Sequence, residues 1–100
     1  MKERDFQKIL IIEIKKRLPD CIVLKNDADY IQGIPDLTIF YKNKWATLEC
    51  KRDRYAKLRP NQEYYVDKMN AMSFSAVIYP ENMEEVLDGM ERSFKRRSRR

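Results

Sequence analysis

The chain has 100 residues, which is enough for one domain with one modest core. It carries a net charge of +5 and no histidine, which excludes histidine-based acid–base catalysis, triads with a histidine partner and the common zinc hydrolases. Two cysteines, Cys21 and Cys50, are too few for a four-ligand thiolate site, so carboxylate and lysine chemistry remains.

The beginning of the chain alternates charged and apolar residues and does not resemble a signal peptide. Its longest uncharged apolar run, Ile9 to Ile12, is far shorter than the roughly 20 residues that a membrane span needs. We therefore expect a cytoplasmic protein with no membrane partner.

Apolar spacing and turn residues predict seven elements in the order α-β-β-β-α-β-α. The helices are expected at about residues 3–18, 60–72 and 83–94, with Asn82 as the cap of the last, and the strands at residues 21–25, 35–42, 44–51 and 75–80. The second and third strands meet around Asn43 and should form an antiparallel hairpin. A helical crossover then adds the fourth strand, which predicts an α/β sandwich with a mixed four-stranded sheet flanked by helices.

The domain should end near Phe94, the last apolar residue of the final helix. We therefore assign residues 1–94 to a single domain and residues 95–100, with the sequence KRRSRR, to a basic and flexible tail.

Charged residues interrupt the two strands of the hairpin. Because side chains alternate along a strand, Glu49 and Lys51 share one face, and Cys50 lies on the other. Asp36 follows Pro35 at the start of the second strand, where the hairpin can bring it beside Glu49. An ordinary exposed ion pair is the alternative explanation for Glu49 and Lys51.

The helices contribute further polar residues on their apolar faces. At about 100° per residue, Glu3 points in nearly the same direction as the apolar stripe of the first helix, and Gln7 lies close to that line. A carboxylate in line with a buried stripe is costly unless it has a partner or a metal. Gln62 opens the apolar stripe of the second helix. Glu13, by contrast, is expected to be a solvated flank residue.

These observations predict a polar cluster at one end of the sheet, formed by Glu3, Asp36, Glu49, Lys51 and Gln62. Oxygen ligands gathered in this way, without histidine or a thiolate pair, suit Mg²⁺ or Mn²⁺.

Two basic clusters favour a polyanionic partner such as DNA. The first, next to Lys51, contains Arg52, Arg54, Lys57 and Arg59, and the second, in the tail, contains Lys95, Arg96 and Arg97. A solvated surface is the alternative explanation, above all for the tail.

The motifs GIPDLTIF, LECKR and LRPNQ, with Glu3 and Gln7 early in the first helix, resemble the VRR-type nuclease domain of the PD-(D/E)XK nuclease superfamily. The resemblance spans residues 3 to about 80. It implies a restriction-endonuclease-like (PD-(D/E)XK) sandwich and the cytoplasm of a bacterium or of a phage-infected host cell.

The resemblance also implies roles for individual residues. Asp36 and Glu49 would bind the divalent metal together with the backbone carbonyl of Cys50. Lys51 would orient or help to deprotonate the attacking water and stabilise charge on the phosphate. Glu3 would support the metal site, directly or through water.

Further residues would position these groups or join two chains. Gln62 would hold the site or the substrate backbone, and Gly33 and Pro35 would shape the turn before Asp36, although plain loop punctuation also explains Gly33. Domains of this kind are expected to act as homodimers, with exposed aromatic side chains as candidates for the dimer surface: Tyr30, Tyr55 and Tyr64.

The expected function is that of a metal-dependent, structure-selective DNA endonuclease acting at four-way (Holliday) or branched junctions. The alternatives are a non-catalytic DNA-binding module on the same fold and a nicking nuclease without junction preference, while a small assembly protein would explain the basic clusters poorly. Both cysteines should be reduced, with Cys50 buried.

Overall fold

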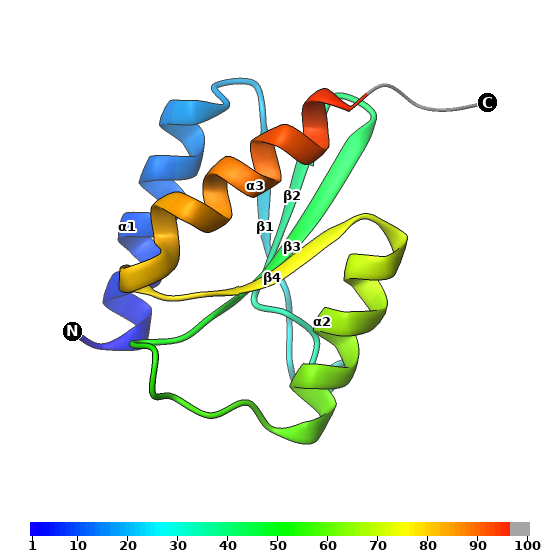
Figure 1. The fold of residues 1–100 in the computed structure, drawn as a ribbon. Helices are drawn as coiled ribbons and strands as arrows, with labels where there is room; N and C mark the ends of the chain where they lie inside the picture. The colour runs from blue at the N-terminus through cyan, green and yellow to red at the C-terminus, as the bar shows by residue number, and fades with distance from the viewer. Residues whose placement is uncertain (97–100) are drawn as a thin grey trace.

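A mixed four-stranded sheet forms the centre of the molecule in the computed structural model, which describes residues 1–96 (Figure 1). The strand order is β1-β2-β3-β4, with the first three strands antiparallel and β4 parallel to β3. The strands are β1 (Ile22–Lys25), β2 (Leu37–Tyr41), β3 (Lys44–Cys50) and β4 (Phe74–Ile78). The predicted α/β class and mixed sheet are confirmed.

Three α-helices and one short 3₁₀ helix complete the fold: α1 (Glu3–Arg17), α2 (Pro60–Met72), η1 (Pro80–Asn82) and α3 (Met83–Lys95). The predicted order of helices and strands is therefore correct. Every helix within residues 1–96 is too short or too polar to span a membrane.

The β2–β3 hairpin sets the position of the charged residues. Its two-residue turn places Lys42 at φ 56°, which suits the tight connection that the sequence predicted around Asn43. The resulting register pairs Leu37 with Leu48. Asp36, one residue before β2, therefore lies across from Glu49.

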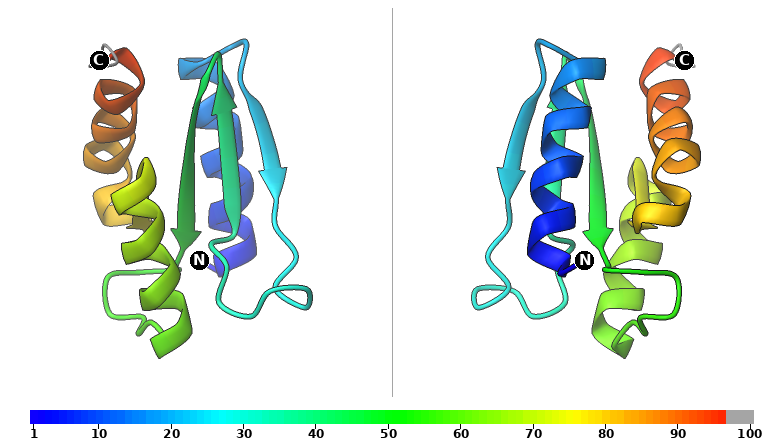
Figure 2. Two further views of the ribbon diagram at one scale, coloured as in Figure 1. Left: turned by 90° about the vertical axis from the view of Figure 1, so that its right-hand side faces the viewer. Right: turned by 90° about the vertical axis from the view of Figure 1, so that its left-hand side faces the viewer.

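The hydrophobic core lies between one face of the sheet and the two helices α1 and α3 (Figure 2). Phe6, Leu10 and Ile14 form the buried stripe of α1, at the spacing that predicted the helix. Leu87 and Met90 of α3 pack into the same core. This core face also buries the alternate residues of β2, β3 and β4: Leu37, Ile39, Ala46, Leu48, Cys50 and Ile78.

The opposite face of the sheet is covered only in part. Helix α2 packs over β3 and β4, where the Thr47 hydroxyl donates a 2.7 Å hydrogen bond to the Ser75 hydroxyl. Over β1 and β2 the apolar side chains of Ile22, Leu24 and Phe40 remain 65%, 50% and 42% exposed. We call these three residues the bare half-face.

Several element ends lie one or two residues from their predicted positions; the second strand, for example, was expected at residues 35–42 and spans Leu37–Tyr41. The fourth strand ends at Ile78 instead of residue 80, because Pro80 lacks an amide donor for the sheet and begins η1. The Asn82 side chain does not cap α3, since it accepts a hydrogen bond from the Tyr79 amide and closes η1. Lys95, which we had assigned to the tail, is the last residue of α3.

Candidate functional site

The carboxylates of Asp36 and Glu49 meet where β2 begins and β3 ends. Glu49 is 2% exposed although its side chain is ionisable, so the alternative of an ordinary surface ion pair is wrong. Asp36 is half-buried, and its Oδ2 accepts a 2.8 Å hydrogen bond from the backbone amide of Cys50. The hairpin therefore holds the two acids together with the main chain at the end of β3.

Gln62 joins Glu49 to Lys51 from the first turn of α2. Its Nε2 donates to Glu49 Oε2 at 3.0 Å, and its Oε1 accepts from Lys51 Nζ at 3.1 Å and from the Arg59 amide at 2.9 Å. Lys51 Nζ also lies 3.6 Å from Glu49 Oε2. The structure thus brings together Asp36, Glu49, Lys51 and Gln62 as the sequence predicted.

One oxygen of this cluster lacks a partner. Glu49 Oε1 is buried, and no group of residues 1–96 donates a hydrogen bond to it. Leaving a buried charged acceptor without a donor is costly, so this atom is suited to a cation or to a proton.

The electrostatics of the two acids follow from burial. Burial, reinforced by Asp36 and opposed by Lys51, raises the pKa of Glu49 to about 7. Burial also raises the pKa of Asp36, against the lowering effects of the Cys50 amide and Lys51. In both cases a positive charge placed at the pair would restore the ionised form.

The oxygen donors of this pair fit a hard divalent cation. Mg²⁺ is commonly bound through one or two carboxylates and completes its shell with water and substrate phosphates. The site offers two carboxylates, and across the described residues no set of three or more acidic or cysteine side chains is close enough to enclose a metal. Asp36 and Glu49, with Glu49 Oε1 free to bind, would hold such an ion.

Glu3 lies at the edge of the cluster instead of inside it. The sequence placed it in line with the buried stripe of α1, but this first residue of the helix is exposed, because the buried stripe of α1 begins only at Phe6. Burial and the charge of Asp36 still raise its pKa. Glu3 and Lys51 line a hollow of about 510 Å³, together with Met1, Lys2, Arg52, Ala56 and Lys57.

The four cations predicted after β3 do not form one surface. Arg52 and Lys57 line the hollow beside Glu3. Arg54 turns toward Glu81 of η1, with 3.6 Å between Nε and Oε2. Arg59 lies next to the 28–32 loop at the beginning of α2.

The tail residues lie elsewhere. Lys95 ends α3, Arg96 follows it and lines a hollow together with Lys44 at the beginning of β3, and Arg97 lies outside the described residues. The expected flexibility of the tail also concerns mainly residues outside the described part of the chain. Both cysteines are free thiols and Cys50 is buried, as predicted.

One supporting residue, Asn26, was not predicted, and Gly33, expected in the turn before Asp36, has a packing role that was not predicted. The Asn26 side chain donates to the Pro35 carbonyl at 2.9 Å and to the Thr38 hydroxyl at 2.8 Å, so it anchors the segment that carries Asp36. A polar residue directly after a strand is the only signal in the sequence. Gly33 has φ +88°, and a Cβ there would lie 2.7 Å from the backbone carbon of Asn61, so this glycine is required for close packing on α2.

Comparison with models of known families, with curated proteins and with solved structures gave no match to this chain. The geometry of the site is therefore the basis of the functional proposal below.

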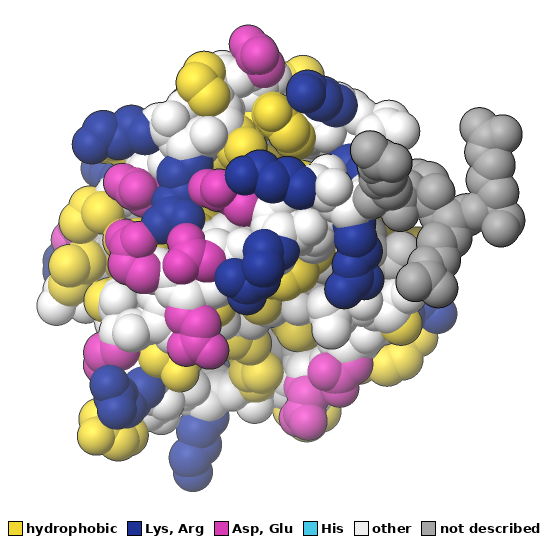
Figure 3. All heavy atoms as spheres, turned by 45° about the horizontal axis from the view of Figure 1, so that its top comes forward, with side chains coloured by type: hydrophobic (Ala, Val, Ile, Leu, Met, Phe, Trp, Pro, Cys, Tyr) yellow, Lys and Arg dark blue, Asp and Glu magenta, His cyan; other side chains and the backbone are white. Residues whose placement is uncertain are grey.

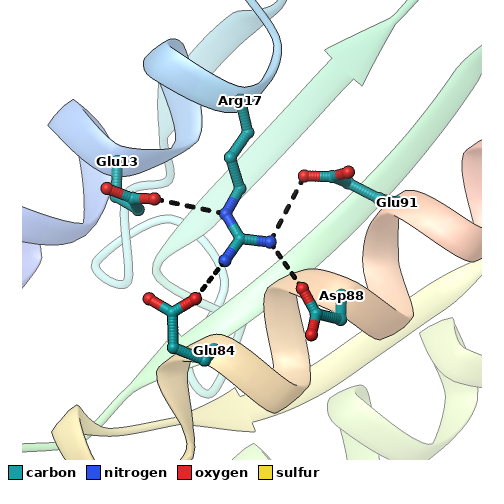
Figure 4. Close-up of polar contacts among 5 residues, drawn as sticks. All are labelled: Glu13, Arg17, Glu84, Asp88 and Glu91. Atoms are coloured by element: carbon teal, nitrogen blue, oxygen red, sulfur yellow. Dashed lines mark hydrogen bonds and ion pairs between the residues drawn. The ribbon is translucent and has the colours of Figure 1, made fainter.

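A second charged cluster joins α1 to α3 away from this site. Arg17 donates to Asp88 at 2.8 Å and to Glu13 and Glu91 at 3.3 Å, and it also contacts Glu84 (Figure 4). Glu13, expected as a solvated flank residue, is part of this cluster. Figure 3 shows acidic side chains gathered around a basic one on the surface of the molecule.

Proposed function

We propose that the chain is a metal-dependent, structure-selective DNA endonuclease that hydrolyses phosphodiester bonds. The observation that carries this proposal is the buried Glu49 Oε1, which has no donor, lies beside a second carboxylate and is linked through Gln62 to Lys51. Two acids and a lysine at one end of a hairpin, with a helix from the crossover closing over them, also support the restriction-endonuclease-like fold and the resemblance to VRR-type nuclease domains.

Asp36 and Glu49 would hold Mg²⁺ or Mn²⁺, with the backbone carbonyl of Cys50 as a further ligand and Glu3 acting through water. When bound, such an ion supplies a hydroxide nucleophile near neutral pH and offsets negative charge on the phosphate. The raised pKa of Glu49, caused by burial, matches a carboxylate that ionises fully only next to a cation.

Lys51 acts on the substrate side of the pair. Its ammonium group is held by Gln62 at 3.1 Å, so it has a defined position although it faces the hollow lined by Glu3. A lysine in this place orients the attacking water and stabilises charge on the phosphate without a histidine. Gln62 is a positioning residue, because its Oε1 accepts a hydrogen bond from the Lys51 ammonium group and its Nε2 donates one to Glu49.

The proposed substrate is DNA, with four-way or branched junctions first, and the proposed assembly is a homodimer, since a two-fold dimer matches a junction whose two symmetric strands must both be cut. Lys2, Arg52 and Lys57 surround the hollow next to Lys51 and would bind the backbone phosphates nearest the cleaved bond.

The test is cleavage of labelled four-way junctions, flaps and plain duplex in Mg²⁺, Mn²⁺ or EDTA. We expect cutting with either metal, none in EDTA, and a loss of at least about 100-fold in Glu49→Gln and Lys51→Ala, as for other groups that stabilise a transition state. Glu63→Gln, an exposed acid on α2, is the matched control and should cut like the natural chain.

Each result separates the alternatives. Cutting of all substrates with equal rates would favour a nicking nuclease without junction preference. Tight DNA binding with no cutting in either metal would favour the non-catalytic module, and cutting that persists in Glu49→Gln would remove the assigned site.

A further inference from the structure

A second hollow lies at the other end of the sheet from the candidate site. It has a volume of about 840 Å³ and is lined by residues from the C-terminal ends of α2 and α3 and the beginnings of β3 and β4. Figure 1 shows these ends of the elements at its top and right. Its lining contains three cations, Lys44, Arg92 and Arg96, and no acidic residue. The remaining lining residues are Asn70, Ala71, Met72, Ser73, Phe74, Gly89 and Ser93.

The described part of the chain offers these three cations no acidic partner. Within residues 1–96, none of the three forms an ion pair with a carboxylate, and the Lys44 ammonium donates instead to the backbone carbonyl of Arg96 at 3.0 Å. Like charges held together without a counter-charge repel each other, and a bound anion removes that cost.

The end of a helix does not explain this arrangement by itself. Cations in the last turn of α3 are favoured by the helix dipole, which accounts for Arg92. Lys44 belongs to the β2–β3 hairpin, so the dipole gives no reason for it to point to the same hollow. Three acids of α3, Glu84, Asp88 and Glu91, contact Arg17 of α1 and do not line the hollow.

Gly89 keeps the floor of the hollow open. A glycine inside a helix costs about 1 kcal/mol relative to alanine. A Cβ at this position would meet only ordinary contacts, 3.5 Å from Phe74 and 3.6 Å from Arg92, so packing does not require a glycine here. The missing side chain leaves room beside the Arg92 guanidinium group.

We propose that this hollow binds a phosphate group of the nucleic-acid backbone, at a second contact point distant from the cleaved bond; this inference rests on the proposed function. The two sites lie at the two ends of β3, from Lys44 to Cys50, and six steps of about 3.3 Å separate them by about 20 Å. A duplex that lies along β3 would bring backbone phosphates of one or the other strand to the hollow about six base pairs, or about 20 Å along its axis, from the cleaved bond.

The experiment measures DNA binding by the full chain in EDTA, by fluorescence anisotropy. Two labelled DNA substrates are compared, one with a short duplex arm of about 4 base pairs beyond the cleavage position and one with a long arm of about 12. The test variant is Lys44→Ala with Arg92→Ala. The control, Lys8→Ala with Lys15→Ala, removes the same charge from exposed positions on α1.

We expect the test variant to bind the long arm about 10-fold more weakly and to lower the salt slope by about 2, with a change below about two-fold on the short arm. The control should change both arms by less than about two-fold. Equal effects of the two variants, or equal losses on both arms, would overturn the proposal. If the alanine variant does not fold, Lys44→Gln with Arg92→Gln is used instead.

Two further measurements identify the source of the phosphate and distinguish this proposal from the proposed function. Inorganic phosphate and a mononucleotide are titrated as competitors of the long-arm DNA. If either displaces the part of the binding that depends on Arg92 at a competitor concentration below millimolar, the hollow is a small-anion site and the DNA contact is overturned. Cleavage by the natural chain is measured separately. If the natural chain does not cleave DNA but the variant binds more weakly, the proposed activity is wrong and the phosphate site stands. If the variant binds DNA like the natural chain, only the phosphate site is wrong.

Discussion

Glu49 is the residue whose environment departs most from what a surface strand offers. Burial and the nearby Asp36 raise its pKa to about 7 against the lowering effect of Lys51, and its Oε1 has no hydrogen-bond donor among residues 1–96. A group of this kind binds protons or cations well, and in their absence it destabilises the fold when it ionises.

This leads to a prediction about stability and pH. An unfolded glutamate ionises near 4.5 and the folded Glu49 near 7, so its contribution to stability is fully present below about pH 4.5 and is lost as the pH rises through about 7. In EDTA, the free energy of unfolding should fall by up to about 3 kcal/mol between pH 5 and pH 8, and Glu49→Gln should remove most of this fall.

Urea denaturation at several pH values measures the effect, with Glu63→Gln as the control that keeps the dependence of the natural chain. A Glu49→Gln variant with the same pH dependence as the natural chain would show that Glu49 is not the titrating group. Asp36, whose pKa is also raised by burial, contributes with the same sign.

Gly33 is the second residue whose identity is set by geometry. Alanine at this position would be held at φ +88° with its Cβ 2.7 Å from the main chain of Asn61. We expect Gly33→Ala to lower the free energy of unfolding by more than about 1 kcal/mol and to reduce cleavage, because the loop before Asp36 would move away from the first turn of α2.

Gly89→Ala is the matched control, since its φ is not in the left-handed region and its Cβ meets only ordinary contacts. This change should stabilise the chain by up to about 1 kcal/mol. Thermal denaturation measures the stability of both variants. A Gly33→Ala variant as stable as the natural chain would mean that the loop accommodates the alanine without loss of stability.

At the scale of the elements, Arg17 connects α1 to α3 through four carboxylates. Its side chain is only 16% exposed, and the hydrogen bond with Asp88 contributes most to raising its pKa above the ordinary value. Without the guanidinium group, four acids would face each other with no positive charge between them.

We therefore predict that Arg17→Ala lowers the free energy of unfolding by about 1–3 kcal/mol, with partial recovery at high NaCl concentration because salt screens the repulsion between the acids. Arg54→Ala, which breaks a single exposed pair with Glu81, should cost less than about 1 kcal/mol. Denaturant unfolding at low and high salt compares the two. A loss in Arg17→Ala that does not change with salt would point to lost packing instead of repulsion.

The elements themselves could be predicted because their signals are local. The stripe of Phe6, Leu10 and Ile14 and the two-residue hairpin turn at Lys42 and Asn43 depend on periodicity and turn chemistry, which are written in short stretches of sequence. The meeting of Asp36 with Glu49 followed from the hairpin register, so the centre of the candidate site was predictable as well.

The parts that could not be predicted depend on contacts between distant segments. The residues near Arg17 in the sequence do not predict its partners on α3, which are about 70 residues away. The support of Asp36 by Asn26 and the exposure of Glu3 depend in the same way on how loops and helix ends meet the sheet. Asn82 has the composition of a helix cap, but the preceding Pro80 starts a 3₁₀ turn that takes its side chain.

At the scale of the whole molecule, the bare half-face is an exposed apolar surface on the face of the sheet that α2 covers only in part. It adjoins β1, an edge strand whose outer backbone groups pair with no strand of the described chain. Two copies related by a two-fold axis could pair their β1 strands antiparallel and bring the half-faces of Ile22, Leu24 and Phe40 side by side.

We predict that light scattering at micromolar concentration gives a mass of two chains for the natural protein. The Leu24→Glu variant should give the mass of a single chain. Ile12→Glu, which places the same charge on an exposed isoleucine of α1, is the control and should remain a dimer. A monomeric natural chain would remove the symmetric-junction argument and favour a nicking enzyme. A dimeric Leu24→Glu variant would favour the exposed rings of Tyr30, Tyr55 and Tyr64 as the dimer surface.

The hairpin register also determines the order in which the candidate site can assemble. Asp36 and Glu49 come together through a local turn, whereas Gln62 reaches Glu49 only after the crossover helix has docked, and non-local contacts of this kind form more slowly. During folding, the open end of the hairpin would thus hold two acids before Gln62 arrives to bridge Glu49 to Lys51. In pulse-labelling hydrogen exchange, β2 and β3 amides should be protected before those of α2; simultaneous protection would mean that sheet and crossover form in one step.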